Sequence, residues 1–223
     1  MKKIIITFFA IISVMTSVSA AGISEGVRIG IGASKTEING TGTERLRDGS
    51  GLSTANKGGS ATLNTSEDTT VGHVFAEKSF SNGFTLGVEY IPGEADISGV
   101  RTRTDDDIET TGNNKASATA EKHYTIYGIM PVGTSPLFVK AGVISMDIIT
   151  NEVLATGSTY GNATVNGVTL GVGAHLERDN GLFIRAELNM SEYENISITS
   201  SGSNIVSADL DTTQTKLSIG KTF

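Results

Sequence analysis

The stretch VTLGVGAHLERDNGLFIRAELNM, residues 168–190, decides the fold. From Val168 to Leu176, apolar side chains occupy every second position, with Thr, Gly and His between them, and Glu177 follows. The same alternation returns from Leu182 to Met190, after the turn residues Arg-Asp-Asn-Gly. A period of two residues is that of a β-strand with two different faces, and a short turn rich in Asp, Asn and Gly joins antiparallel strands. The stretch therefore predicts a β-hairpin.

The alternation extends outward from this hairpin along the chain. It recurs clearly at residues 27–34, 84–90, 137–143 and 217–223, and more weakly at 71–80 and 121–130. Eight strands are thus expected. Three connections are short and carry turn residues: 81–83, 131–136 and 178–181. Four are long and polar: 36–70, 92–120, 147–166 and 191–208. Because long and short connections alternate, all the long loops are expected at one end of an antiparallel meander.

Composition agrees with a single all-β unit. A chain of 223 residues suits one β-barrel or β-sandwich domain. It contains 27 Gly and 18% charged residues, whereas about 25% charged is usual. The absence of Cys excludes a disulfide framework, a thiol nucleophile and a Cys-ligated metal. We expect no cofactor.

Residues 1–20 have the pattern of a secretory signal peptide. A basic start at Lys2 and Lys3 precedes an apolar run, and small residues end with Ala20. The expected mature domain, residues 21–223, lacks two of the 17 basic residues and none of the 24 acidic ones, which leaves a net charge of −9. An acidic exported chain without basic clusters is a poor binder of nucleic acid.

The two faces of the predicted strands differ in a way that indicates a membrane. One face is aliphatic or aromatic and nearly free of charge over about the 9–11 residues that a tilted strand needs to cross a bilayer. The other face mixes Gly, Ser and Thr with about one charge per strand, which suits a narrow lumen. A closed eight-stranded antiparallel up-and-down transmembrane barrel is therefore expected, because lipid leaves no partner for an open sheet edge. A soluble lipocalin-like binding barrel, with the apolar face inside, is the alternative.

If the apolar face meets lipid, a nearly balanced set of charges lies in the lumen. This set is Arg28, Glu77, Glu89, Glu121, Lys140, Glu177, Arg185, Glu187 and Lys216. Burial requires such ions to pair, so we expect cross-strand ion pairs and no large pore. The turn lengths place Glu77 opposite Gly87 and Phe80 opposite Phe84. They also place Gly173 opposite Arg185, and Gly171 opposite Glu187.

Taken together, the signal peptide, eight alternating strands, three short turns, four long loops and final aromatic Phe223 resemble the small outer-membrane barrels of the OmpA/OmpX type. In that family the last strand ends in an aromatic residue with apolar residues at alternate positions, which Leu217, Ile219 and Phe223 match and Lys221 does not. The resemblance implies location in the bacterial outer membrane, contact with lipopolysaccharide, periplasmic termini and external loops. It also implies that the barrel-assembly machinery recognises Leu217, Ile219 and Phe223.

Two functional classes remain open. The first is a non-enzymatic barrel with a structural, adhesive or surface-interaction role, binding an extracellular ligand through its long loops. The second is an enzyme that modifies lipid A, which would need a His with a nearby Ser and a carboxylate. His73 and His123 bring no Ser onto the neighbouring inward position, and His175 shares a face with Glu177 at the periplasmic end. A non-enzymatic role is therefore expected.

Charged groups in the predicted loops offer weaker binding candidates. Asp105, Asp106 and Asp107 could supply oxygen ligands to a cation, although the spaced pattern of an EF-hand is absent. Pairs of Arg at 45 and 47, and at 101 and 103, could contact phosphates of lipopolysaccharide. Solvated loop charges are the more common explanation of both features.

Overall fold

The computed structural model describes residues 25–45, 62–105, 112–154, 157–202 and 205–223. Within these ranges the chain forms nine strands: β1 (Gly26–Arg45), β2 (Thr62–Ser79), β3 (Thr85–Asp105), β4 (Gly112–Pro131), β5 (Leu137–Val153), β6 (Ala163–Glu177), β7 (Leu182–Tyr193), β8 (Ile196–Thr199) and β9 (Ile205–Thr222). No helix in the described ranges is long and apolar enough to cross a membrane. The predicted signal peptide lies outside the described residues.

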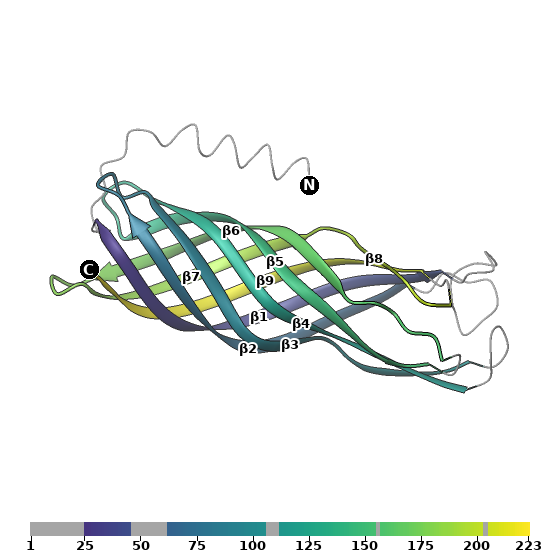
Figure 1. Ribbon diagram of the computed structural model, residues 1–223. Helices are drawn as coiled ribbons and strands as arrows, with labels where there is room; N and C mark the ends of the chain where they lie inside the picture. Colours follow the sequence, from purple (N-terminus) through teal and green to yellow (C-terminus); the bar gives the residue numbers. More distant parts are fainter. Residues whose placement is uncertain (1–24, 46–61, 106–111, 155–156, 203–204) are drawn as a thin grey trace.

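The strands form one closed antiparallel barrel (Figure 1). From β1 to β7 each strand pairs with the next in sequence, and β7 pairs with β9. The pairing of β1 with β9, from Arg28–Thr222 to Arg45–Ile205, completes the wall. The short β8 pairs with β9 beyond the end of the β7–β9 ladder and continues the course of β7 after an interruption. Together, β7 and β8 thus form one interrupted barrel strand, and the predicted eight-stranded barrel is confirmed.

Two of the tight turns share one geometry. In both, a three-residue loop ends in a glycine with positive φ, Gly83 at 79° and Gly181 at 80°. In the first turn the Phe80 amide donates to the Phe84 carbonyl at 2.9 Å, as the predicted register requires. In the second, Arg178 belongs to the ladder, because its amide donates to the carbonyl of Leu182 at 2.9 Å. The predicted register of β6 and β7 requires both Glu177 and Arg178 to lie in the loop, whereas both belong to the ladder.

The correct register of the β6–β7 hairpin is displaced by two residues from the prediction. Gly173 faces Glu187 and Gly171 faces Asn189, while Arg185 faces His175. A shift of two residues keeps each side chain on its face, so the inward direction of Arg185 and Glu187 is unaffected. The predicted pairing of Glu77 with Gly87 is confirmed.

The strands continue far into the segments that were predicted as long loops. The longest, β3, has 21 residues, whereas about 9–11 suffice to cross a bilayer. The prediction failed there because the extensions are rich in Thr and Ser, and their apolar residues point inward instead of outward. Thr favours strands through its branched side chain, and pairing with a neighbouring strand fixes the backbone. The barrel therefore continues well beyond the membrane.

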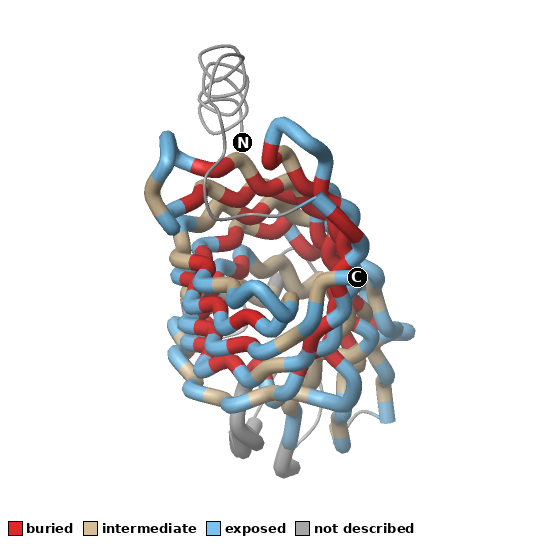
Figure 2. Tube along the Cα trace, turned by 90° about the vertical axis from the view of Figure 1, so that its left-hand side faces the viewer, coloured by how far each residue is buried: buried red, intermediate tan, exposed pale blue. Residues whose placement is uncertain are grey.

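Buried and exposed residues alternate along much of the barrel wall, as Figure 2 shows in red and pale blue. In β5, for example, Phe138 and Lys140 are buried in the interior at one end, and Met146 and Ile148 at the other. The interior is thus polar near the short turns and apolar toward the opposite end. The half near the short turns faces lipid and has a polar interior, whereas the other half faces water and has an apolar interior.

Candidate functional site

An apolar belt encircles the outside of the barrel near the short turns. Its side chains are roughly half exposed, including Ile31 at 56%, Leu188 at 46% and Ile219 at 56%. Aromatic rings border the belt on both sides. Phe80 stacks on Phe84 at the turn end, and Tyr90 stacks on Tyr124 at the other, with ring centroids 6.1 and 4.7 Å apart. An apolar band between aromatic girdles is the outer surface of a transmembrane β-barrel.

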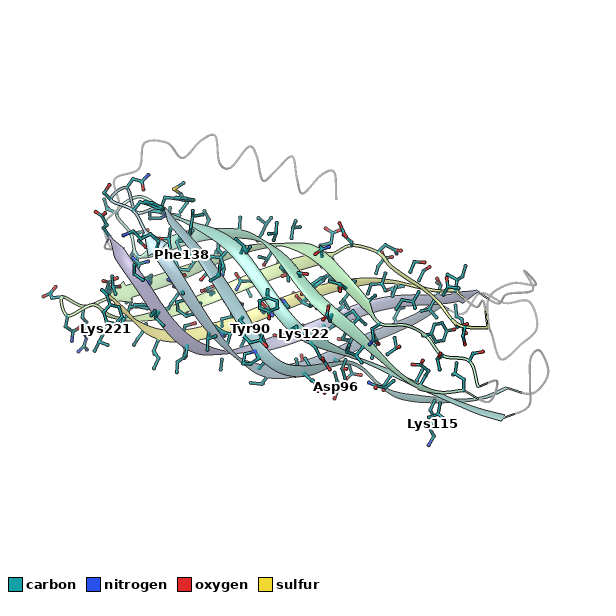
Figure 3. The ribbon with its side chains drawn as sticks, in the orientation of Figure 1. Tyr90, Asp96, Lys115, Lys122, Phe138 and Lys221 are labelled. Carbon is teal, nitrogen blue, oxygen red and sulfur yellow. The ribbon has the colours of Figure 1, made fainter. Side chains whose placement is uncertain are left out.

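Outward charges mark the upper limit of the belt. They form a polar ring on seven strands: Lys35, Asp68, Glu94, Lys122, Asp147, Glu192 and Asp211. Figure 3 shows Lys122 close to Tyr90 at mid-length of the barrel, with Asp96 farther from the short turns. Everything beyond this ring projects from the membrane into water.

Within the membrane half, aromatic rings lie over glycines of the neighbouring strand. Five directly paired positions follow this rule: Gly30–Phe75, Gly32–His73, Gly87–Tyr127, Gly173–Phe138 and Gly220–Phe183. A Cβ atom added to Gly32 would lie 2.5 Å from the His73 ring, and one added to Gly87 would lie 2.5 Å from the Tyr127 ring. Gly173, which was predicted to face Arg185, thus accommodates the ring of Phe138 from the neighbouring strand.

A bidentate ion pair lies at the centre of the lumen. The Arg185 guanidinium donates to both carboxylate oxygens of Glu77, at 2.6 and 2.7 Å. The Tyr127 hydroxyl donates to the same carboxylate at 2.6 Å, and Arg28 lies 3.7 Å from it. The guanidinium of Arg185 also lies over the ring of Phe75, 5.0 Å from its centroid. Fork-to-carboxylate geometry is among the strongest and most directional of charged contacts.

Further ion pairs extend this centre across the barrel. Lys140 bridges Glu187 at 2.9 Å and Glu89 at 3.5 Å, and Lys216 contacts Glu89 from the opposite wall. Lys140 also lies over the ring of Tyr127, 3.9 Å from its centroid. Toward the short turns, Glu177 lies 3.7 Å from Arg28 and 3.0 Å from His175. We call this set the lumen network: Arg28, Glu77, Glu89, Lys140, Glu177, Arg185, Glu187 and Lys216.

The lumen network is electrically neutral, with four cations and four carboxylates. Its side chains are at most 8% exposed. Paired and hydrogen-bonded ions tolerate such burial, whereas an unpaired one would cost several kcal/mol. Charged groups and rings together fill this part of the lumen with side chains.

Glu121 was predicted for the lumen and does not lie there. It pairs in register with Glu94 and Asp147, which are outward positions on β3 and β5. A β-bulge at this point inserts one residue into β4, and Lys122 adopts a positive φ of 50°. The extra residue reverses the alternation, so Glu121 and Lys122 both lie on the outer face. Outside the belt, Lys122 donates to Asp147 at 3.1 Å, which raises the pKa of Lys122.

Three His lie inside the barrel, and one of them meets a Ser that the sequence analysis missed. His73 Nε2 lies 2.9 Å from Ser218 Oγ, two strands away, because Gly32 between them has no side chain. The position of Gly32 between two inward-facing polar residues on the neighbouring strands was the signal that could have predicted this contact. The second ring nitrogen of His73 has no hydrogen-bond partner among the described residues. His73 and Ser218 are 2% and 1% exposed, so the pair lacks both an orienting carboxylate and access for a substrate.

Above the lumen network the interior becomes an apolar chamber. Its core consists of nine buried side chains: Ile38, Ile97, Ile144, Met146, Ile148, Val165, Tyr193, Ile196 and Leu210. A cavity of about 40 Å³ lies within the chamber, where its lining includes Ile91, Ala120 and Leu210. One water needs about 10–15 Å³ on this measure, so the cavity has room for more than one small group.

The remaining predicted site residues are placed as follows. Leu217, Ile219 and Phe223 lie on the outer face, with exposed fractions of 60%, 56% and 72%. Asp105 ends β3, whereas Asp106 and Asp107 lie outside the described residues, as does Arg47. Among the described residues, no cluster of three or more His, Asp or Glu side chains could hold a metal ion.

Solved structures of similar overall shape include three from bacteria. The Ail attachment invasion locus protein of Yersinia pestis, in complex with the heparin analogue sucrose octasulfate, is 10% identical, with a TM-score of 0.47 over 90% of this chain and 100% of that one. The outer membrane protein OprG of Pseudomonas aeruginosa is 12% identical, with a TM-score of 0.49 over 91% and 98% of the two chains. The outer membrane protease OmpT of Escherichia coli is 10% identical, with a TM-score of 0.48 over 89% and 97%. No family model and no curated protein matches the sequence.

Proposed function

We propose that this chain, an eight-stranded bacterial outer-membrane β-barrel, is a non-enzymatic surface protein that interacts with extracellular partners through its projecting half. The observation that carries the proposal is the division of the barrel at the polar ring. Below the ring, a neutral and fully buried lumen network fills the interior. Above it, the wall extends on strands such as β3, whose 21 residues are about twice the length that the membrane requires.

The projecting half is the part of the molecule that a partner outside the cell can reach. Its outer face carries Asp, Glu, Lys, Asn and Thr side chains, and its apolar interior keeps it folded in water. Ion pairs on this face are exposed, such as Lys35–Asp68 at 3.1 Å. Exposed pairs contribute little to stability, so these charges remain available for contacts with a partner.

The surface role is tested by shortening the barrel without breaking it. Asp96 and Thr119 face each other on β3 and β4, so the hairpin can be cut at these positions and closed with a short turn. Bacteria that display the full chain should be retained on surfaces under flow better than bacteria that display equal amounts of the shortened barrel. Equal retention of both strains would contradict the surface role.

A lipid A-modifying enzyme is the second candidate, and the 2.9 Å contact between His73 and Ser218 is the observation in its favour. Mass spectra of lipid A from expressing cells separate the two functions. We expect spectra identical to those of cells carrying an empty vector. A modified lipid A that disappears with Ser218→Ala would establish the enzyme instead.

A further inference from the structure

One seam of the barrel wall is only partly paired. The ladder between β2 and β3 ends at Val74–Tyr90, well short of the far ends of both strands. The adjoining ladders run on, β1–β2 as far as Thr43–Thr62 and β3–β4 as far as Asp105–Gly112. Among the described residues, therefore, two hairpins separate above this point and leave a gap in the wall.

The local sequence of β3 explains why the seam ends there. Pro92 lies two residues beyond Tyr90, the last residue of β3 that pairs with β2, and has no amide hydrogen to donate to β2. Gly93 has a φ of +96°, and the pairing of β3 with β4 shifts register between Ile91 and Glu94. A bulge of this kind bends the strand, here away from β2. No described atom lies within 4 Å of the position that a Cβ on Gly93 would take.

The gap begins at the top of the lipid-facing belt. Its lower limit is Tyr90, whose ring stacks on Tyr124 in the upper aromatic girdle. The polar ring passes above the start of the gap through Asp68 and Glu94. The lower part of the gap thus borders the outer leaflet of the membrane. Unpaired backbone at this depth is tolerated only where it lines a cavity or meets water.

The cavity of the apolar chamber lies directly behind the gap. Its lining includes Thr69 and Val71 from β2 and Ile91 and Ala95 from β3, which are the walls of the gap itself. It also includes Glu94, an exposed residue of the outer face, so the cavity reaches the outside at this seam. The opposite wall is formed by residues such as Leu210. Polar side chains such as His123 and Gln214 also line the cavity, but most of its surface is apolar, so it can take up apolar groups.

We propose that the gap is a lateral window through which the hydrocarbon chain of an outer-leaflet amphiphile enters the apolar chamber. Continuity with the leaflet favours a molecule that already resides in the bilayer over a water-soluble one. Entry of the chain end replaces contact with lipid by contact with the chamber wall, and leaves the head group outside at the polar ring.

Charges beside the window select the head group. Glu94, Asp96 and Glu121 lie near it on the outer faces of β3 and β4, and Glu94 directly faces Glu121. The cation next to Glu121 on β4, Lys122, donates to Asp147 at 3.1 Å. An anionic head group would meet repulsion here, so the amphiphile carries a head group without negative charge.

The experiment uses the complete absence of Trp from the chain. Tyr193→Trp places a single fluorophore in the chamber wall, and Tyr124→Trp places one on the outer face in contact with lipid. Barrels refolded in phosphatidylcholine vesicles receive a long-chain alcohol that carries a nitroxide near its chain end. The alcohol should quench both fluorophores. An alkyl sulfate of the same length and label should quench Tyr124→Trp fully and Tyr193→Trp severalfold less.

Closing the window tests the route. Ala95→Phe, combined with Tyr193→Trp, fills the mouth of the cavity and should reduce quenching by the alcohol severalfold. Ala76→Phe, on the outer face of β2 below the gap, is the matched control and should leave quenching unchanged. Unboiled electrophoresis verifies each folded barrel, and Val71→Phe replaces Ala95→Phe if the latter does not fold.

Three results would overturn the proposal. Absence of quenching at Tyr193→Trp, while Tyr124→Trp is quenched, would show that no chain enters the chamber. Unchanged quenching in Ala95→Phe and Val71→Phe would show entry through the extracellular mouth. Equal quenching of Tyr193→Trp by the sulfate and by the alcohol would show that the assignment of the head group is wrong. None of these measurements depends on the proposed surface role, because all are made on purified barrels.

Discussion

The most consequential single residue in the lumen is Arg185, because two carboxylates depend on it. Its bidentate contact holds Glu77 at 2.6 and 2.7 Å, and it lies 3.6 Å from Glu187. Arg185→Leu would leave the buried Glu77 carboxylate with the Tyr127 hydroxyl at 2.6 Å and with the more distant guanidinium of Arg28, 3.7 Å away. We expect a loss of about 3–5 kcal/mol in the free energy of unfolding, measured by denaturant titration in detergent. Adding Glu77→Leu should recover part of this loss, and no recovery would contradict the pairing.

Alternation alone could assign most lumen charges from the sequence, since each follows from the parity of its strand. Glu121 could not be assigned in this way, because one inserted residue at Lys122 reverses the parity, and nothing in the local composition marks the bulge. Contacts across several strands, such as His73 with Ser218, were equally inaccessible. They depend on the barrel closing and on the absence of a side chain at Gly32.

The ring-over-glycine rule gives a second prediction at this scale. A methyl group added to Gly32 would lie 2.5 Å from both the His73 ring and the backbone oxygen of Leu217, whereas one added to Gly72 would have its nearest atom at 3.8 Å. We expect Gly32→Ala to lower the free energy of unfolding by about 1–3 kcal/mol, because overpacking forces neighbours to move. Gly72→Ala, on the outer face, is the control and should unfold like the parent. Equal midpoints of denaturant unfolding for Gly32→Ala and Gly72→Ala would refute the ring-over-glycine rule.

At the scale of elements, the sequence predicts the parts of the strands that cross lipid but does not predict the parts that extend beyond the membrane. Inside the membrane, the outward residues are apolar and form a regular set with a period of two. Above the ring the apolar set passes to the inward positions, where Ile38 and Met146 stand among Thr, Ser and Asn. The pattern there is weak because an extended wall facing water needs only a few apolar residues per strand. Hydrogen bonding to the neighbouring strands stabilises the rest of this wall, and a single sequence does not show that pairing.

Strand β9 tests this inversion within one element. Leu217 and Asp211 both point outward, the first in the belt and the second in the polar ring. Leu217→Arg should cost about 2–4 kcal/mol when unfolding is measured in lipid vesicles, because the charge would face hydrocarbon. Asp211→Arg should cost far less, since its side chain faces water. Comparable losses at the two positions would contradict the boundary assigned to the membrane.

On the scale of the whole molecule, two stacked compartments share one wall. The lower one is filled by the lumen network and by rings over glycines, and the upper one is apolar, with a cavity and an incomplete seam. Burial of a neutral ion network stabilises a fixed arrangement only while all its members are present. The lower compartment is therefore the rigid seal of the barrel. The upper one, bounded by a partly paired wall, is where binding can occur without opening a path across the membrane.

This division predicts the conductance of full and shortened barrels. In planar bilayers the full chain should show no stepwise ionic conductance, because about eight strands leave an interior that side chains fill. The barrel cut between Asp96 and Thr119 should be equally silent. Every member of the lumen network lies below that cut, and the shortened barrel keeps its contacts from Arg28 to Lys216. If the part of the apolar chamber that this cut removes, including Ile97, completed the seal, the shortened barrel alone would conduct. Stable current steps from the shortened barrel would therefore show that the upper compartment blocks the passage of ions.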